Sequence, residues 1–150
     1  MNKYIIRLNT KRCIGCHACE IHCKTNKELP PGPILCEIRH EPLRMVKGFP
    51  KTITHFKSCH HCEDPLCIPV CPTESMKKRD DGIVYIDEEK CIGCMSCADI
   101  CPWDSPQFNP ETKKAVKCDY CMDRLDNGLK PACVTLCTAH ALQLFTLQAV

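Results

Sequence analysis

Cysteine spacing constrains this chain more than any other feature. Of its 150 residues 17 are cysteine, and 16 of these fall into four groups of four. The third group is Cys91-x2-Cys94-x2-Cys97-x3-Cys101, with Pro102 directly behind it. In this run three thiolates ligate one [4Fe-4S] cube, and the fourth ligates a different cube where two are present. One such run therefore predicts a second elsewhere in the chain.

The other three groups repeat this pattern with altered spacing. They read Cys13-x2-Cys16-x2-Cys19-x3-Cys23, Cys59-x2-Cys62-x4-Cys67-x3-Cys71 and Cys118-x2-Cys121-x11-Cys133-x3-Cys137. Only Cys36 lies outside the groups. A spare ligand or a redox thiol is one interpretation of Cys36. Its place beside Leu35 and Ile38 in an apolar stretch favours a buried, inert thiol.

Three other cysteine chemistries compete with cubes. Structural zinc usually takes two C-x2-C pairs separated by a loop, and three cysteines within seven residues crowd a single zinc ion. Disulfides fit poorly in a chain without a signal-type segment and with cysteines three residues apart. A radical enzyme that cleaves S-adenosylmethionine would need Cys-x3-Cys-x2-Cys and an open iron, whereas every group here has four cysteines. The grouping favours four [4Fe-4S] clusters.

Composition and charge limit the size of core, the cellular location and the class of partner that we expect. Aromatic residues make up 5% of the chain, which predicts a small hydrophobic core. No apolar run approaches a membrane span, so we expect no direct membrane span and a reducing cytoplasm. The formal net charge of +2 counts every cysteine as neutral. Because each oxidised cube with its four thiolates would add about −2, this charge gives no reason to expect a nucleic-acid partner.

Short strands and helices alternate with the cysteine groups. We expect strands at 4–8, 34–39, 51–56 and 141–146, hairpins at 76–87 and 108–116, and helices at 19–26 and 119–127. The predicted fold is α+β, with two tandem bacterial-ferredoxin-like modules dominated by their clusters. Groups one and four would form an outer module, residues 1–35 plus 105–150. Groups two and three would form an inner module, residues 50–104.

Function follows from what the clusters do and what the chain lacks. The sequence has no dinucleotide fingerprint, phosphate loop, zinc-protease motif or flavin fingerprint. Clusters of this kind pass single electrons, at potentials set by charge, hydrogen bonds to sulfur and exposure. We therefore predict an electron-transfer subunit that is not itself an enzyme, with the substrate chemistry in a partner.

The order and gaps of the sixteen cysteines resemble the iron–sulfur subunits of the dimethyl-sulfoxide-reductase family. The resemblance runs from Cys13 to Cys137. It implies that groups one and four share two cubes and that groups two and three share the others. The implied ligand sets are Cys13, Cys16, Cys19 and Cys137 (cluster 1); Cys23, Cys118, Cys121 and Cys133 (cluster 2); Cys59, Cys62, Cys67 and Cys101 (cluster 3); and Cys71, Cys91, Cys94 and Cys97 (cluster 4).

The same resemblance implies partners. The four clusters would form a linear series, which we call the wire. A catalytic molybdenum or tungsten subunit would face cluster 1 at one end, and a flavin subunit, a ferredoxin or another copy of the chain would face the other end. Many members of that family are longer and carry a C-terminal extension. From the length of this chain we expect a compact complex, such as the polyferredoxin subunit of a tungsten-dependent aldehyde oxidoreductase. A free polyferredoxin serving a hydrogenase or carbon monoxide dehydrogenase is the alternative. A redox sensor would need an output domain for which there is no room.

Overall fold

The computed structural model describes residues 4–147, and within them each sheet is a pair of antiparallel strands. The pairs are β1 (Tyr4–Leu8) with β10 (Leu142–Thr146), β2 (Cys36–His40) with β5 (Thr54–Ser58), β3 (Arg44–Val46) with β4 (Phe49–Lys51), β6 (Met76–Lys78) with β7 (Val84–Ile86), and β8 (Gln107–Asn109) with β9 (Lys114–Val116). The helices are α1 (Ala18–Asn26), α2 (Ser96–Asp99), α3 (Met122–Asp126) and α4 (Ala132–Thr135). The predicted mixture of short helices and strands is confirmed.

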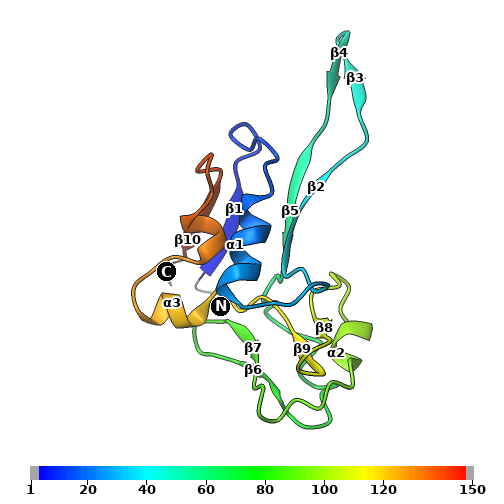
Figure 1. The fold of residues 1–150 in the computed structure, drawn as a ribbon, viewed down its shortest axis with the longest axis vertical. Helices are drawn as coiled ribbons and strands as arrows, with labels where there is room; N and C mark the ends of the chain where they lie inside the picture. Colours follow the sequence, from blue (N-terminus) through cyan, green and yellow to red (C-terminus); the bar gives the residue numbers. More distant parts are fainter. Residues whose placement is uncertain (1–3, 148–150) are drawn as a thin grey trace.

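The strands predicted near the two ends of the chain pair with each other. Tyr4 lies opposite Thr146 and Leu8 opposite Leu142. Figure 1 shows β1 and β10 side by side, with α1 against them. This pairing brings the segment before the first cysteine group next to the segment after the fourth.

Two short hairpins lead into the third and fourth cysteine groups, where the sequence predicts them. In β6–β7 the turn closes through Gly82, whose φ of 84° is in the left-handed region that glycine accepts without strain. In β8–β9 the side-chain oxygen of Asn109 accepts hydrogen bonds from the backbone N–H groups of Glu111 and Thr112, at 3.0 and 3.3 Å. Each hairpin thereby fixes the approach of the next cysteine group.

Helix α3 is shorter than the predicted helix at 119–127. Tyr120 and Cys121 both have positive φ, 54° and 51°, so helical geometry cannot begin before Met122. The predicted stop is correct, because Gly128 has φ 73° and the Leu129 N–H returns to the Arg124 carbonyl at 2.9 Å. The cysteine loop, rather than helix propensity, sets the start of α3.

A long ribbon projects from the body of the molecule. The strand expected at 34–39 is β2, whereas the strand expected at 51–56 is interrupted between β4 and β5, and β3 is a strand that the sequence did not predict. The β2–β5 pair forms the base of the ribbon and β3–β4 its outer part (Figure 1). Lys47 and Gly48 connect β3 to β4 with φ of 51° and 81°, the geometry of a two-residue hairpin turn. We call residues 41–53, which lie beyond the base, the arm.

Cysteines form much of the interior. Five of the ten buried residues in the larger core are cysteines, together with Leu35, Ile38, Val134, Ala141 and Leu142. The smaller core combines Cys91 and Cys97 with Met76, Val84 and Ala115. The core is therefore built around thiols. None of the helices in residues 4–147 has the length and apolar character to cross a bilayer.

Candidate iron–sulfur centres

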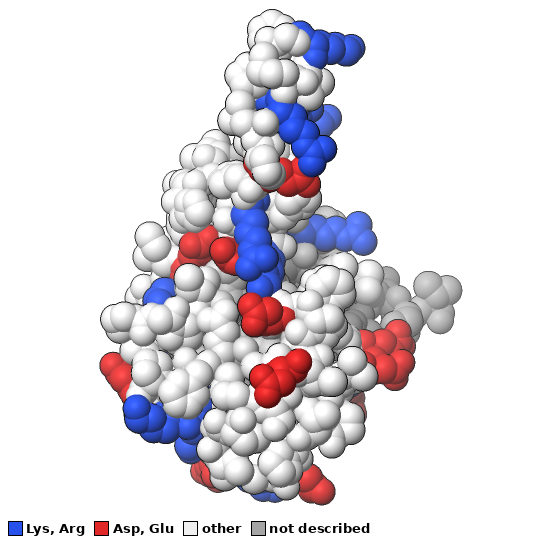
Figure 2. All heavy atoms as spheres, turned by 90° about the vertical axis from the view of Figure 1, so that its right-hand side faces the viewer, with Lys and Arg blue, Asp and Glu red and all other residues white. Residues whose placement is uncertain are grey.

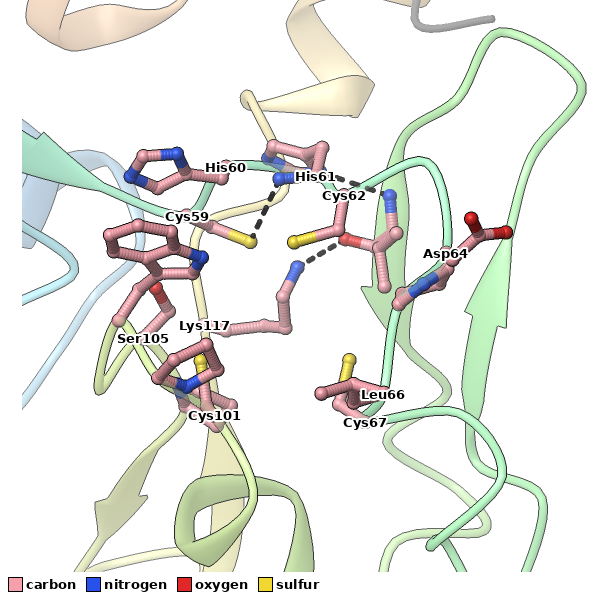
Figure 3. A pocket seen from close by; sticks show the side chains of 15 residues that line it. Cys59, His60, His61, Cys62, Asp64, Leu66, Cys67, Cys101, Ser105 and Lys117 are labelled. Atoms are coloured by element: carbon pink, nitrogen blue, oxygen red, sulfur yellow. Dashed lines mark hydrogen bonds between the residues drawn. The ribbon is translucent and has the colours of Figure 1, made fainter.

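The first pocket is lined by three cysteines of the second group and the last cysteine of the third: Cys59, Cys62, Cys67 and Cys101. Figure 3 shows their side chains around one cavity. The backbone N–H of His61 donates a hydrogen bond to the Cys59 sulfur at 3.4 Å. Hydrogen bonds to the charged form of a group favour that form, so this contact stabilises a thiolate.

A second pocket has the reciprocal composition, three cysteines of the third group and the last of the second: Cys71, Cys91, Cys94 and Cys97. The hydroxyls of Ser75 and Thr73 lie 3.1 and 3.7 Å from the Cys71 sulfur. Burial raises the pKa of Cys71, but the hydrogen bond from Ser75 and one from the Met76 backbone outweigh it and bring the pKa to about 6. Cys71 is therefore a thiolate at neutral pH, the form that binds metal.

The fourth group meets the last cysteine of the first in another pocket, which is lined by Cys23, Cys118, Cys121 and Cys133 and also by the ungrouped Cys36. Burial raises the pKa of Cys118 well above its usual value, and the nearby sulfurs of Cys23, Cys59 and Cys133 raise it further. A bound metal deprotonates a coordinating thiol outright. A positively charged iron–sulfur core is the kind of group that would hold these crowded thiols as thiolates.

The first group lies at the surface side of the same core. Cys13, Cys19 and Cys137 pack together there. Cys16 is exposed, and its sulfur is 3.6 Å from the hydroxyl of Thr138, the residue that follows Cys137. The backbone N–H of Ala141 donates to the Cys137 sulfur at 3.2 Å. These contacts bring cysteines from the two ends of the sequence into one neighbourhood.

Left-handed residues shape the cysteine loops. His17 follows Cys16 with φ 57°, and Met95 follows Cys94 with φ 62°; each caps the helix that carries the next cysteine of its group. Gly93 has φ 70°, and a Cβ built on it would overlap the carbonyl oxygen of Lys113. Close backbone approach thus requires glycine at this position of the third group.

The donor sets fit [4Fe-4S] clusters. All seventeen cysteines are free thiols, and no disulfide joins any of them. Soft thiolate ligands select iron–sulfur clusters, zinc or Cu(I). At three of the sites the structure gathers three cysteines from one group and the last cysteine of another, which is how two cubes share a pair of C-x2-C-x2-C-x3-C runs.

Cys36 is buried in β2, with 3% of its surface exposed. Its sulfur lies 3.6 Å from the carbonyl oxygen of Cys19. Hydrogen bonding with Cys133, Cys19 and Cys23 raises the pKa of Cys36 far above the usual range. Cys36 is therefore a neutral thiol, which can donate a hydrogen bond to the surrounding sulfurs.

Sequence reasoning missed Lys117, which lies beside the Cys59 pocket, and favoured a hydrogen-bonding or solvent-facing role over cluster ligation for His61. Lys117 is 7% exposed and donates a hydrogen bond to the main-chain carbonyl of Val84 (Figure 3). It also donates one to the main-chain carbonyl of Cys118, at 2.7 Å. His61 is 1% exposed, and its Nδ1 accepts the Val84 N–H at 3.0 Å. Burial and the Lys117 charge lower the pKa of His61 well below its usual value, so it is neutral. The available signal was a lysine and a histidine directly beside grouped cysteines.

The comparisons with known proteins agree with this geometry. A family model described as a 4Fe-4S dicluster domain matches residues 51–147. The chain belongs to this family. It is a small ferredoxin-like [4Fe-4S] domain of mixed helices and strands, and the predicted family and cluster type are confirmed.

Characterised relatives of this dicluster protein are subunits of reductases. It is 39% identical over 147 residues to the thiosulfate reductase electron transfer subunit PhsB of Salmonella typhi, covering 95% of this chain and 75% of the relative. It is 38% identical over 152 residues to a chain of the anaerobic dimethyl sulfoxide reductase of Escherichia coli, covering 93% and 72%. A subunit of the tetrathionate reductase of Salmonella typhimurium is 35% identical over 143 residues, and this chain spans 56% of that subunit's length.

Proposed function

We propose that this chain is an electron-transfer subunit that binds four [4Fe-4S] clusters and relays single electrons between a catalytic reductase subunit and a further redox partner. The exchange of the last cysteine between groups carries the proposal. Cys101 joins group two in one pocket, Cys71 joins group three in another, and Cys23 joins group four in a third. A set of isolated zinc sites would have no reason for this reciprocal arrangement.

The ligand assignment follows the same exchange. We assign Cys13, Cys16, Cys19 and Cys137 to cluster 1, Cys23, Cys118, Cys121 and Cys133 to cluster 2, Cys59, Cys62, Cys67 and Cys101 to cluster 3, and Cys71, Cys91, Cys94 and Cys97 to cluster 4. The four proposed ligands of cluster 2 line one pocket, those of cluster 3 a second and those of cluster 4 a third, which supports these three sets. For cluster 1 the support is the shared core and the contact of Cys16 with Thr138.

Two modules joined end to end would make these sites a linear wire. Pairing of β1 with β10 supports an outer module of residues 1–35 plus 105–150, and the reciprocal pockets of groups two and three support an inner module of residues 50–104. The Cys59 sulfur is close enough to Cys118 to raise the pKa of that thiol. This proximity supports cluster 2 and cluster 3 as neighbours where the two modules meet. The order is cluster 1, cluster 2, cluster 3, cluster 4.

The protein's part in electron transfer is to hold and surround the thiolates. When bound, each cluster takes up and releases one electron without a change of ligands. Backbone N–H groups of His61 and Ala141 stabilise negative charge on the Cys59 and Cys137 sulfurs. Eight of the sixteen proposed ligand cysteines are buried, and their burial limits the rearrangement of water that accompanies each electron.

The partner is proposed from the relatives. Their printed names describe subunits of thiosulfate, dimethyl sulfoxide and tetrathionate reductases. We infer a catalytic partner of the molybdenum reductase class, and we propose the reducing cytoplasm as the setting, since grouped cysteines that serve as metal ligands are common there. The names favour this partner over the tungsten aldehyde oxidoreductase and over a free polyferredoxin. A flavin subunit, a ferredoxin or a second copy of the chain would serve the cluster 4 end.

Anaerobic purification from the native host tests this function. We expect the chain to co-purify in fixed proportion with a larger subunit that contains molybdenum, and the substrate of that enzyme to exchange electrons with the clusters. Isolation of the chain alone, fully loaded and reducible by hydrogenase or carbon monoxide dehydrogenase, would instead identify a free polyferredoxin.

A further inference from the structure

The arm exposes an unusual amount of apolar surface. All six residues of β3 and β4 are exposed. The exposed fractions are 70% for Leu43, 68% for Met45 and 75% for Phe49. Contiguous apolar surface of this kind marks interaction sites on soluble proteins. The arm therefore requires an explanation that cluster binding alone does not provide.

Beyond Glu41, every charged residue of the arm is positive. Arg44, Lys47 and Lys51 are its cations, and the one acidic residue in 41–53 is Glu41 at the base. Glu41 is already paired, with the His55 ring at 2.8 Å and the Arg44 guanidinium at 3.3 Å. Figure 2 shows Lys and Arg side chains along the projecting part, with acidic side chains only lower down. A surface that binds the outer arm must be apolar and carry negative charge.

Backbone groups distinguish a protein partner from a lipid surface. In the part of the chain that the structure describes, β3 pairs with β4 and with no other strand, so each keeps an edge of N–H and C=O groups. A bilayer interior cannot satisfy such groups, whereas a protein groove can pair with them by strand addition. Apolar side chains on both faces of a two-stranded ribbon also need a partner that encloses both. These features favour a groove in a protein.

The base of the arm lies beside the first cysteine group. The rings of His17 and His40 are 6.0 Å apart, and the His40 ring packs against Gly15. The Glu20 carboxylate accepts the Ile38 N–H at 2.6 Å, which fixes β2 to α1. The group-one loop is itself exposed, with Cys16 at the surface and Ile14 71% exposed. A partner that holds the arm would therefore also cover this loop.

We propose that the arm is a docking element for the catalytic subunit, which receives it in an apolar groove with an acidic rim. Docking there places the group-one loop, and with it the Cys16 end of the wire, against the catalytic subunit. The proposal rests on the proposed function, because it takes its partner from there. It adds the surface that binds this partner and the chemistry of the groove.

The test uses holoprotein and the catalytic subunit separated from the purified complex. One variant combines Met45→Ser with Phe49→Ser, and a second combines Lys47→Glu with Lys51→Glu. The matched control combines Leu129→Ser with Lys130→Glu, because Leu129 is 52% exposed and closely follows α3, a helix that lies away from the arm (Figure 1). Iron content and far-ultraviolet circular dichroism verify that each variant is folded and loaded.

Binding is measured anaerobically by biolayer interferometry. We expect each arm variant to bind roughly 30-fold more weakly or worse, the scale of a lost interface hot spot, and the control to match wild type. A benzophenone amino acid at position 49 should cross-link to the catalytic subunit, and the same group at position 129 should not. Unchanged binding by both arm variants, or stronger binding after charge reversal, would overturn the docking proposal and leave the proposed function standing.

Two further outcomes separate the alternatives. Failure of the wild-type chain to bind the catalytic subunit would remove the proposed function and the docking proposal together. Vesicles of phosphatidylglycerol and phosphatidylcholine are tested in parallel by co-sedimentation. If the arm variants lose vesicle binding while they retain subunit binding, the arm is a membrane-surface element and the docking proposal is wrong.

Discussion

The rings of His61 and Tyr120 are in contact, with centroids 3.9 Å apart and planes inclined by 39°. This contact joins the second cysteine group to the fourth, although the third group lies between them in the sequence. His61 also accepts the Val84 N–H and so attaches β7 to the same point. The contact lies where the proposed cluster 2 and cluster 3 sites adjoin.

Removal of the His61 ring should loosen this junction. His61→Ala would leave a cavity and an unpaired Val84 N–H, which together cost about 2–4 kcal/mol. We expect the apparent melting temperature of the anaerobic holoprotein to fall by roughly 5–10 °C. His55→Ala is the control, since His55 is exposed on the ribbon and its loss should change the melting temperature little. Equal effects of the two substitutions would show that the ring contact does not stabilise the junction.

Gly15 and Gly93 hold equivalent positions in groups one and three, but substitution by alanine should affect cluster loading differently at the two positions. A Cβ on Gly93 overlaps the backbone carbonyl of Lys113, whereas a Cβ on Gly15 meets the side chain of His40, which can move. We therefore expect Gly93→Ala to lose about four irons per chain, one cube, and Gly15→Ala to retain all of its iron. Iron analysis after anaerobic purification measures both. Full loading of Gly93→Ala would mean that the loop accommodates the added methyl group.

Lys117 should raise the potential of the proposed cluster 3, whose pocket it lines, since a buried positive charge favours the more negative, reduced state. Lys117→Met should lower that potential by on the order of 50 mV. Lys90→Met is a matched control, because Lys90 also directly precedes a grouped cysteine but is exposed. Redox titration followed by electron paramagnetic resonance compares the two. If Lys90→Met lowered the potential of the same cluster as much as Lys117→Met does, a specific role for the buried Lys117 charge would be contradicted.

Local sequence signals predicted most of the elements and the cysteine grouping. Turn residues such as Gly82 and Gly128 determine short-range geometry, so the hairpins and the end of α3 could be found from the sequence. The start of α3 could not, because positive φ at Cys121 comes from the cysteine loop. The burial of Lys117 and His61 could not be predicted for a related reason, because it depends on contacts with distant residues, which no local pattern encodes.

The proposed order, from cluster 1 to cluster 4, predicts different losses of electron transfer at its two ends. Cys16→Ser should stop substrate-driven reduction of the remaining clusters in the purified complex. Cys94→Ser should leave that reduction in place but slow transfer to an external acceptor. Both complexes must first be shown to assemble, by size-exclusion chromatography. The reverse pattern would place the catalytic subunit at the Cys94 end of the chain.

The central claim is that this chain holds four [4Fe-4S] clusters on sixteen cysteines, with Cys36 outside the ligand sets. Iron and acid-labile sulfide analysis of the anaerobic protein, on wild type and on Cys36→Ser, tests it most directly. We predict about sixteen iron and about sixteen sulfide per chain in both proteins, from four of each per cube. About four metal ions per chain, mostly zinc, or the loss of a cluster in Cys36→Ser alone, would contradict it.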